Sequence, residues 1–270
     1  MTQLFRPLKK YKHWQRGLRR PRPRVGLLDD QLAGWFQSQT GHLVDGFQIT
    51  AEDVVIDVGC GDGAAATAFI AAQGADVIAT DVDPAVLEIT KRKLQKSHAR
   101  RYQTIVSDSN PLPIEDGRAT RVVCMEVLEH VPDPPKFMAE LVRVGRPGAK
   151  YLLTVPDPAS ESVQNGIAPD VYWQVPNHLR VFTRDGFASF VRESGLEVER
   201  QFFRGFYWAV WWTMFWACDQ EYGDPEHPIL RHWTESWHAL ISSPKGKQVK
   251  QALDAHLPKS QGIVAVKPAA

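Results

Sequence analysis

The sequence has 270 residues, a formal net charge of +1 and 43% hydrophobic residues, which fits one globular core with attachments. No apolar run reaches the roughly 18 residues that cross a bilayer, so we expect no helical membrane span. The three cysteines are odd in number and far apart, which excludes a disulfide framework, and without CxxC spacing we predict no metal site. With no apolar signal-peptide run, the expected location is cytoplasmic.

Charge is unevenly distributed along the chain. Residues 1–24 contain nine Lys and Arg residues, and no acidic residue occurs before Asp29. We interpret this segment as a basic flexible tail in front of a domain that spans residues 25–270. Such a tail suits contact with anionic lipid or nucleic acid, and a solvated segment without a partner is the other interpretation.

Apolar and helical segments alternate after the tail. The pattern predicts helices at residues 27–38, 64–72, 84–95, 136–144, 183–194 and 246–256. Strands are predicted at residues 54–58, 77–80, 104–106, 122–125, 151–155, 196–206 and 262–267. Residues 157–181 are predicted as a loop, and residues 219–260 as polar apart from the helix at 246–256. The fold class is therefore α/β, with a seven-stranded, mostly parallel sheet, helices on both faces and an antiparallel last strand.

A glycine-rich turn follows the first predicted strand of this sheet. The strand ends in Asp57, and the turn contains Gly59, Cys60, Gly61 and Gly63 before the next helix begins. Glycine allows a tight turn and a close approach of backbone to ligand, and the helix N-terminus offers N–H donors. The spacing is G-x-G-x-G rather than the G-x-G-x-x-G of dinucleotide sites.

Acidic residues follow the next two strands. Asp81, with Val82 after it, lies about 20 residues beyond the glycines, where an acid can bind both ribose hydroxyls. Asp108 and Ser109 follow the third strand. A cap or turn residue explains each acid alone, but three acids at three successive strand ends indicate a ligand crevice. Asp83 precedes Pro84 and is predicted to cap the next helix.

These motifs resemble those of class I S-adenosylmethionine-dependent methyltransferases. The segment from Glu126 through Glu129 and His130 to Pro134 reads EVLEHVPDP, which looks like the type 11 group that includes ubiquinone- and menaquinone-pathway enzymes. The resemblance covers roughly residues 50–200 and implies a Rossmann-like fold with S-adenosyl-L-methionine as cofactor. It also implies a set of cofactor-binding residues, namely Asp57, Gly59, Cys60, Gly61, Gly63, Asp81, Val82, Asp108, Ser109 and Glu126.

Two histidines are the candidate catalytic residues. His130 follows the fourth strand, and His178 lies in a predicted acceptor-side loop at residues 157–183. Either could accept a proton from an oxygen acceptor, whereas a structural role in a loop or at a helix entry is the alternative. We read Cys124 as a buried strand residue.

An aromatic insertion follows the sixth strand, at residues 207–260. Residues 207–218 carry no charge and are predicted to form a helix whose tryptophans wall an apolar acceptor pocket. Contact with a membrane surface, helped by the basic tail, and simple core packing are the alternatives.

The sequence thus predicts methyl transfer from S-adenosylmethionine to a small-molecule or lipid-like acceptor with an apolar part. Oxygen is the expected acceptor atom, and carbon methylation is the alternative. Peripheral membrane contact remains open. No RNA-binding module is evident, so we expect no nucleic-acid partner. The alternative from a different class is a non-catalytic adenosylmethionine-binding or scaffold protein that presents its aromatic face to a partner.

Overall fold

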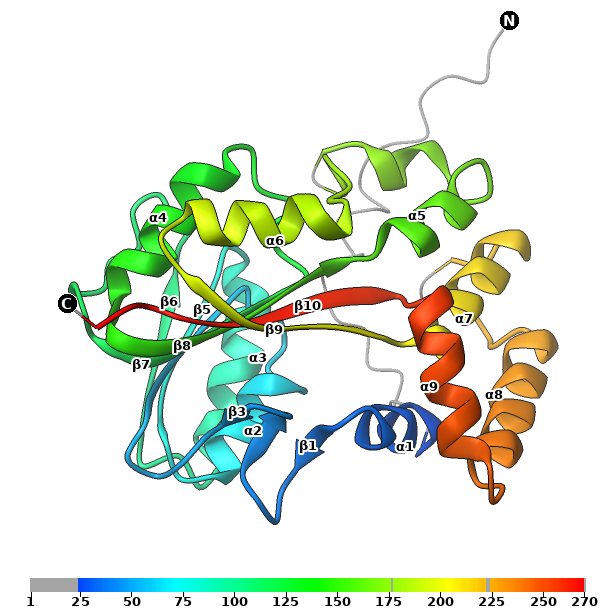
Figure 1. Ribbon diagram of the computed structural model, residues 1–270, viewed down its shortest axis with the longest axis horizontal. Coiled ribbons are helices and arrows are strands. Elements are labelled where there is room, and N and C mark those ends of the chain that lie inside the picture. Colours follow the sequence, from blue (N-terminus) through cyan, green and yellow to red (C-terminus); the bar gives the residue numbers. More distant parts are fainter. Residues whose placement is uncertain (1–23, 176, 222–223, 270) are drawn as a thin grey trace, which may run out of the picture.

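The main sheet of the protein has seven strands in the order β6-β5-β4-β7-β8-β10-β9. The computed structural model describes residues 24–175, 177–221 and 224–269. Strands β4 to β8 pair in parallel, whereas β10 runs antiparallel between β8 and β9 (Figure 1). The predicted α/β fold and its antiparallel last strand are confirmed. The strands of this sheet are β4 (Val54–Val58), β5 (Asp76–Asp81), β6 (Arg101–Val106), β7 (Ala119–Met125), β8 (Gly145–Pro156), β9 (Glu197–Arg204) and β10 (Ser260–Val266).

Helices cover both faces of the sheet, as the alternation in the sequence predicts. One face packs against α4 (Pro134–Val144) and α6 (Arg184–Glu193), and the other against α2 (Ala66–Ala72) and α3 (Pro84–Leu94) (Figure 1). The central strand β4 is buried along its whole length. It therefore alternates its apolar side chains between two separate cores, as parallel strands covered on both sides do.

The helix predicted at residues 27–38 is wrong in its second half. The helix α1 (Arg24–Leu32) ends early because Gly34 adopts a left-handed backbone with φ of +85°. The chain then forms β1 (Trp35–Gln37), which pairs with β2 (His42–Val44) and through it with β3 (Phe47–Gln48) in a small antiparallel sheet. Of the predicted basic tail, residues 1–23 lie outside the described residues.

Two more helices replace segments predicted as loop or polar chain. Helix α5 (Pro158–Gln164) begins after Asp157, whose carboxylate accepts from the N–H of Ala159, and η2 (Asp170–Trp173) follows. Helix α8 (Pro228–Ile241) begins after His227 in the same way. Both α5 and α8 have proline at their first position, directly after a capping side chain, which is a signal for a helix start. The sequence prediction instead treated the prolines in these segments as signs of a loop.

A helical cluster made of α1, α7 (Phe206–Ala217), α8 and α9 (Gly246–His256) stands at one end of the sheet (Figure 1). The buried ammonium of Lys250 holds it together: its Nζ lies 3.0 Å from Asp29 of α1 and 2.6 Å from Asp254. Trp237 of α8 donates to the same Asp29 carboxylate at 2.8 Å. The Asp29 carboxylate thus joins α1 to α9 through Lys250 and to α8 through Trp237.

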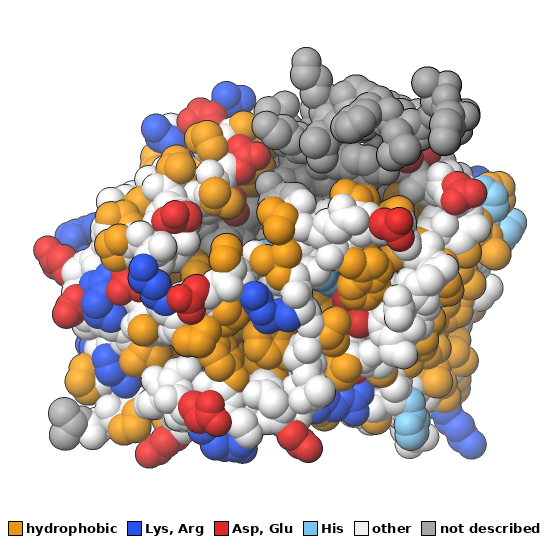
Figure 2. Space-filling view, turned by 90° about the horizontal axis from the view of Figure 1, so that it is seen from above, with side chains coloured by type: hydrophobic (Ala, Val, Ile, Leu, Met, Phe, Trp, Pro, Cys, Tyr) orange, Lys and Arg blue, Asp and Glu red, His pale blue; other side chains and the backbone are white. Residues whose placement is uncertain are grey.

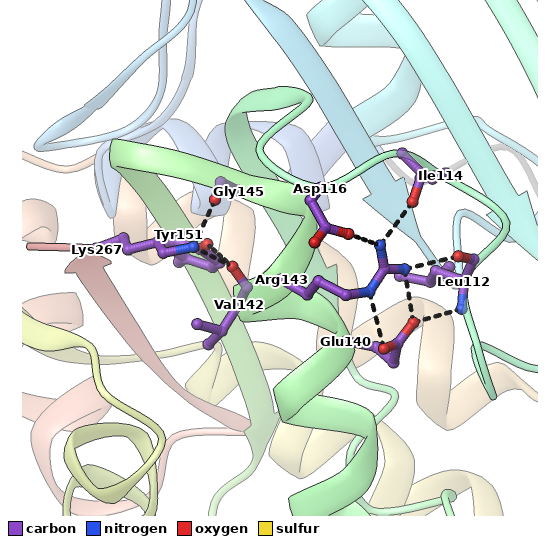
Figure 3. A network of polar contacts seen from close by, with 9 residues as sticks. All are labelled: Leu112, Ile114, Asp116, Glu140, Val142, Arg143, Gly145, Tyr151 and Lys267. Carbon is purple, nitrogen blue, oxygen red and sulfur yellow. Dashed lines mark hydrogen bonds and ion pairs between the residues drawn. The ribbon is translucent and has the colours of Figure 1, made fainter. Parts of the chain in front are cut away.

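A second network fixes the loop between β6 and β7. Arg143 of α4 donates to the carbonyl oxygens of Leu112 and Ile114 at 2.8 Å each, and pairs with Asp116 and Glu140 (Figure 3). Glu140 in turn accepts from the N–H of Leu112. The loop is therefore tied to α4 at several points, which positions the residues that precede it at the sheet edge.

Replacing Lys250 with methionine should strongly destabilise the protein. Lys250→Met leaves the carboxylates of Asp29 and Asp254 buried without their cation, and breaking a buried ion pair from one side costs about 3–5 kcal/mol. Chemical denaturation of the variant should show this loss in the free energy of unfolding. Lys247→Met, an exposed change on the same helix, is the control. A loss equal to that of the control would contradict the role given to Lys250.

Candidate functional site

The glycine-rich turn joins β4 to α2 at the carboxyl end of the sheet. The N–H groups of Gly59 and Cys60 donate to the carbonyl of Thr80, and Gly61 N–H donates to Asp81 Oδ2 at 2.9 Å. Gly59 has φ of +72°, and a Cβ there would lie 2.4 Å from Cγ2 of Val127. No other residue fits this position, so the turn is held against the neighbouring strand β5 and the loop after β7.

Asp81 ends β5 and faces the same crevice. Its Oδ1 accepts from the N–H of Asp83 at 2.9 Å and its Oδ2 from Gly61. Each carboxylate oxygen has a further lone pair, so the group can still accept two hydrogen bonds from a ligand. Asp83 caps α3, as predicted, by accepting from the N–H groups of Ala85 and Val86.

The far side of the crevice comes from the turn after β6. Asp108 is exposed and accepts from the N–H of Asn110, whereas Ser109 is buried and has φ of +62°. Val82 stands opposite with 60% of its surface exposed. An exposed apolar side chain beside acceptor groups suits a flat, polar-edged ring such as adenine.

A cleft runs along the carboxyl ends of β4, β5 and β7. Eight of the predicted site residues line it, namely Gly59, Gly61, Asp81, Val82, Asp108, Ser109, Glu126 and His130. Val127, Val131, Pro132 and Phe137 add an apolar side near His130. The remaining four predicted residues, Asp57, Cys60, Gly63 and His178, are not among its lining residues.

Three of those four stand behind the glycine-rich turn. The Cys60 thiol faces the Gly61 carbonyl, and burial raises its pKa, so it is no nucleophile at neutral pH. A Cβ on Gly63 would meet Thr90 of α3 at 2.9 Å. Asp57 is buried and accepts from the Thr67 hydroxyl at 2.5 Å. Burial, opposed by Thr67 and helped by the Asp81 charge, raises the pKa of Asp57 to about 6.

Glu126 begins the loop after β7 in a strained backbone conformation. It has φ of +55°, in the left-handed region that favours glycine. Its carboxylate accepts from Thr154 at 2.9 Å and lies 3.5 Å from Lys259 Nζ. Burial alone would raise the pKa of Glu126, but Lys259 and Arg204 hold it below its usual range. An anionic group therefore stands at the middle of the cleft.

The two candidate histidines lie together. The rings of His130 and His178 are 5.1 Å apart between centroids, in an edge-to-face arrangement. His178 is buried, and its Nδ1 lies 2.8 Å from Glu161 Oε2 of α5. The Tyr172 hydroxyl donates to the other oxygen of Glu161 at 2.9 Å. Since a carboxylate only accepts, Nδ1 of His178 donates to Glu161, and Nε2 is the ring nitrogen left for another partner.

Glu129 is a functional candidate that sequence reasoning did not single out. It is 1% exposed, and neither carboxylate oxygen has a hydrogen-bond partner among the described residues. The nearest cationic candidate is His130, whose Nε2 lies 3.6 Å from Oε1. Burial and the charge of Glu126 raise the pKa of Glu129 well above its usual range. The EVLEH run hints at this residue only by its charge, because burial is not visible in the sequence.

Backbone contacts join the two loops that carry the histidines. Leu179 N–H donates to the Glu129 carbonyl at 2.9 Å. The Arg180 guanidinium donates to the carbonyls of Leu128, Val131 and Pro132. His178 and His130 are therefore held together by the chain next to each of them, although 48 positions separate them in sequence.

The aromatic segment is helical, as predicted, but most of it is turned away from the cleft. Trp211 and Phe215 stack within the helical cluster, and no residue of α7 lines the described cleft. The expected pocket wall is therefore wrong for Trp211. Trp216 is the exception, since its Nε1 donates to Gln164 of α5 and its ring lies 5.8 Å from that of Tyr172.

We expect Asp57→Asn to stabilise the ligand-free protein above neutral pH. Folding raises the pKa of Asp57 from 3.8 to about 6, so its contribution to stability is complete below about pH 4 and is lost as pH rises through 6. At 1.36 kcal/mol per unit, the ionised group costs about 3 kcal/mol. Denaturation of both proteins should give a more stable variant at pH 8 and equal stabilities at pH 4. A variant that is less stable at pH 8 would show that Asp57 is not strained by burial.

Comparison with known proteins matches the part of the chain from β4 to β8 to one family. Residues 56–153 match a family described as a methyltransferase domain. Tocopherol O-methyltransferase from Arabidopsis thaliana is 35% identical over 100 residues, which is 37% of this chain and 29% of that protein. Ubiquinone biosynthesis O-methyltransferase from Thiobacillus denitrificans is 37% identical over 94 residues, covering 35% and 40% of the two chains. The chain thus spans less than half the length of these curated relatives.

Solved structures extend the likeness to the whole fold. A Haloferax volcanii protein, solved in complex with the Trm112 methyltransferase activator, covers 96% of this chain and 98% of its own, with a TM-score of 0.59 and 16% identity. The [4+2]-cyclase SpnF covers 91% and 94%, with a TM-score of 0.56 and 17% identity. At these identities the likeness concerns the fold alone. Residues 56–153 thus resemble a methyltransferase domain, and the whole chain shares its fold with solved structures named as methyltransferases.

Proposed function

We propose that this protein transfers the methyl group of S-adenosylmethionine to an oxygen atom of a small-molecule or lipid-like acceptor. In this proposal Asp81 binds the ribose, and Asp108 with Ser109 binds the adenine. Asp57, Gly59, Cys60, Gly61 and Gly63 hold the methionine end, with Val82 and Glu126 completing the site. The fit is supported by the free acceptor positions on Asp81 and by the open space beside Gly61, where a Cβ would meet nothing within 4 Å.

The observation that carries the choice of oxygen is the position of the histidines. His130 lines the cleft beyond Glu126, and its ring contacts the buried pair of His178 and Glu161. A hydroxyl acceptor loses a proton as it is methylated, and an imidazole is a side chain that commonly accepts such a proton. The tocopherol and ubiquinone relatives are both named as O-methyltransferases.

The chemistry asks little of the chain beyond alignment and proton removal. The bound cofactor supplies a methyl group on a positively charged sulfur, and the electron pair of the broken C–S bond stays on that sulfur. The acceptor oxygen forms the new O–C bond, and its proton leaves toward His130. The apolar residues Val127, Val131 and Phe137 exclude water from this end of the cleft, which favours a fixed acceptor orientation.

We further propose that residues 157–183 form the acceptor side of the site and that the acceptor has an apolar part. Tyr172, Trp173 and His178 form one ring cluster within this segment, and Trp216 of α7 contacts Tyr172. Exposed Val163 and Ile167 lie in the same segment. Figure 2 shows hydrophobic side chains interspersed with charges of both signs on the face turned to the viewer. Among the described residues no helix is long and apolar enough to cross a membrane.

A second candidate is a protein that binds adenosylmethionine without methyl transfer. The likeness to the [4+2]-cyclase SpnF favours this candidate, because that protein has a similar fold but is named for a reaction other than methyl transfer. Against it stand the glycine turn and acids arranged around one cleft. Incubating the protein with cell extract and cofactor labelled in its methyl group separates the two, since only a methyltransferase would move label into an extract component.

Asp81→Ala should weaken S-adenosylmethionine binding at least about tenfold, because hydrogen bonds to a charged group are worth about 1.5–3 kcal/mol. Calorimetric titration of the cofactor measures this, with thermal unfolding to check the fold. Glu88→Ala, an exposed acid on α3, is the matched control. Equal affinities in the two variants would remove Asp81 from the cofactor site.

His130→Ala should lose roughly 100-fold or more in turnover while keeping its cofactor affinity, as expected for a residue that handles the acceptor proton. The readout is transfer of labelled methyl to the acceptor found in extract. His232→Ala, in an exposed histidine of α8, is the control. Near-normal turnover in both His130→Ala and His178→Ala would mean that neither histidine takes part in the reaction.

A further inference from the structure

Three potential metal ligands converge beside the cleft. Glu129, His130 and His178 each offer one ligand atom, and these atoms all lie within 4.8 Å of one another. In a tetrahedral site with bonds of about 2.0–2.1 Å, donor atoms are about 3.4 Å apart. Small rotations of the three side chains therefore bring them to coordination distance around one ion.

The buried carboxylate of Glu129 is the independent observation that asks for a cation. It is 1% exposed, and within the part of the chain that the structure describes neither oxygen has a hydrogen-bond partner. Buried polar groups are almost always paired, because an unpaired one loses its solvation without compensation. The half-buried Glu126 and the buried Glu161 are close by, and among the described residues Lys259 approaches only Glu126. A cation bound beside Glu129 would thus be flanked by three carboxyl groups.

His178 has the second bond that metal-binding histidines need. A histidine ligand commonly donates its other ring N–H to a carboxylate, which orients the ring and fixes which nitrogen faces the metal. Here Glu161 accepts from Nδ1 of His178 and from the Tyr172 hydroxyl. Nε2 of His178 is left for the cluster. The contact of Leu179 N–H with the Glu129 carbonyl holds the two ligand loops in register.

We propose that Glu129, His130 and His178 bind one divalent transition-metal ion of the zinc type. Two imidazoles and one carboxylate are a donor set of catalytic zinc sites, which keep a fourth position open. Magnesium prefers oxygen ligands alone. This proposal differs from the sequence-based prediction of no metal site. That prediction considered ligands close together in the sequence, whereas the three ligands proposed here come from two separate loops.

The open position gives the ion a role in the reaction. His130 lines the cleft, so a ligand in the fourth position would lie at its acceptor end. An acceptor hydroxyl bound there would be oriented and made more acidic by the positive charge. This role rests on the proposed function, whereas binding of the ion does not. With the ion bound, the two histidines hold the metal and the acceptor proton would leave to solvent water, whereas His130 would accept that proton only in the ion-free protein.

The test is zinc binding by the full chain, without tag, after removal of metal with a chelator. Titration calorimetry with Zn²⁺ should show one saturable site per chain, and Mg²⁺ at the same concentration should not displace it. Glu129→Gln and His178→Gln should each bind Zn²⁺ at least tenfold more weakly, and His232→Gln, in an exposed histidine, should bind it normally. Affinity for S-adenosylhomocysteine checks that each variant is folded.

Glu161→Gln tests the residue that orients His178. Glu161 contacts no metal in the proposed site, and the substitution keeps the size of the side chain. It should weaken Zn²⁺ binding about 10- to 100-fold through His178. The proposal would be overturned by the absence of a saturable site in the parent protein. It would also be overturned if Glu129→Gln, His178→Gln and Glu161→Gln each bound Zn²⁺ as tightly as the parent protein does. Methyl transfer that persists in chelator-treated protein without zinc binding rejects the ion alone. Zinc binding without methyl transfer to any extract component rejects the proposed function alone.

Discussion

The site depends on the parallel pairing of β4 with both β5 and β7. Because the three strands run in the same direction, their carboxyl ends meet at one edge, and the chain leaves β4 toward one face while β7 leads into α4 on the other. This divergence opens the crevice in which sheets of this type bind ligands. Gly59 keeps the crevice open, because any side chain at that position would collide with Val127. The order of the strands therefore determines where the proposed cofactor end and the proposed acceptor end of the cleft lie.

The same edge collects negative charge that the fold does not fully neutralise. Asp57 is buried behind the glycine turn, and Glu126 has a strained backbone conformation. The carboxyl group of Glu129 has no hydrogen-bond partner in residues 24–175, 177–221 and 224–269. Each of these features costs stability in the ligand-free protein, whereas a bound ligand with positive charge would offset the cost. The charges fall into two groups: Asp57 lies behind the proposed methionine end, and Glu129 lies beside the histidines. Binding at one end thus changes the electrostatic environment of the other, with Glu126 between them.

Sequence patterns predict this architecture best where a single local signal decides it. The strand-glycine-helix run at residues 54–72 and the Asp83-Pro84 helix start were predicted because cap, glycine and apolar run agree locally. The helix α8 was missed because its apolar positions are mixed with charged ones, and Gly34 was not recognised as the end of α1. At the site, residues next to strand ends were predictable from spacing. Glu129 and Glu161 were not, since their importance comes from burial and from contacts with residues of other elements, such as that between Glu161 of α5 and His178.

The acceptor end is attached to the rest of the protein through α5. Glu161 on this helix holds His178, Gln164 accepts from Trp216 of α7, and Asp157 at its start binds Arg184 of α6. A short helix of seven residues thus connects the buried histidine to the aromatic helix on one side and to the sheet cover on the other. Movement of α7 would be transmitted to His178 through α5 and Tyr172, because these contacts are side-chain hydrogen bonds and ring contacts rather than flexible chain. The helical cluster that contains Lys250 thus fixes the position of α7 and, through Trp216 and α5, contributes to the position of His178, although most of its aromatic rings lie away from the cleft.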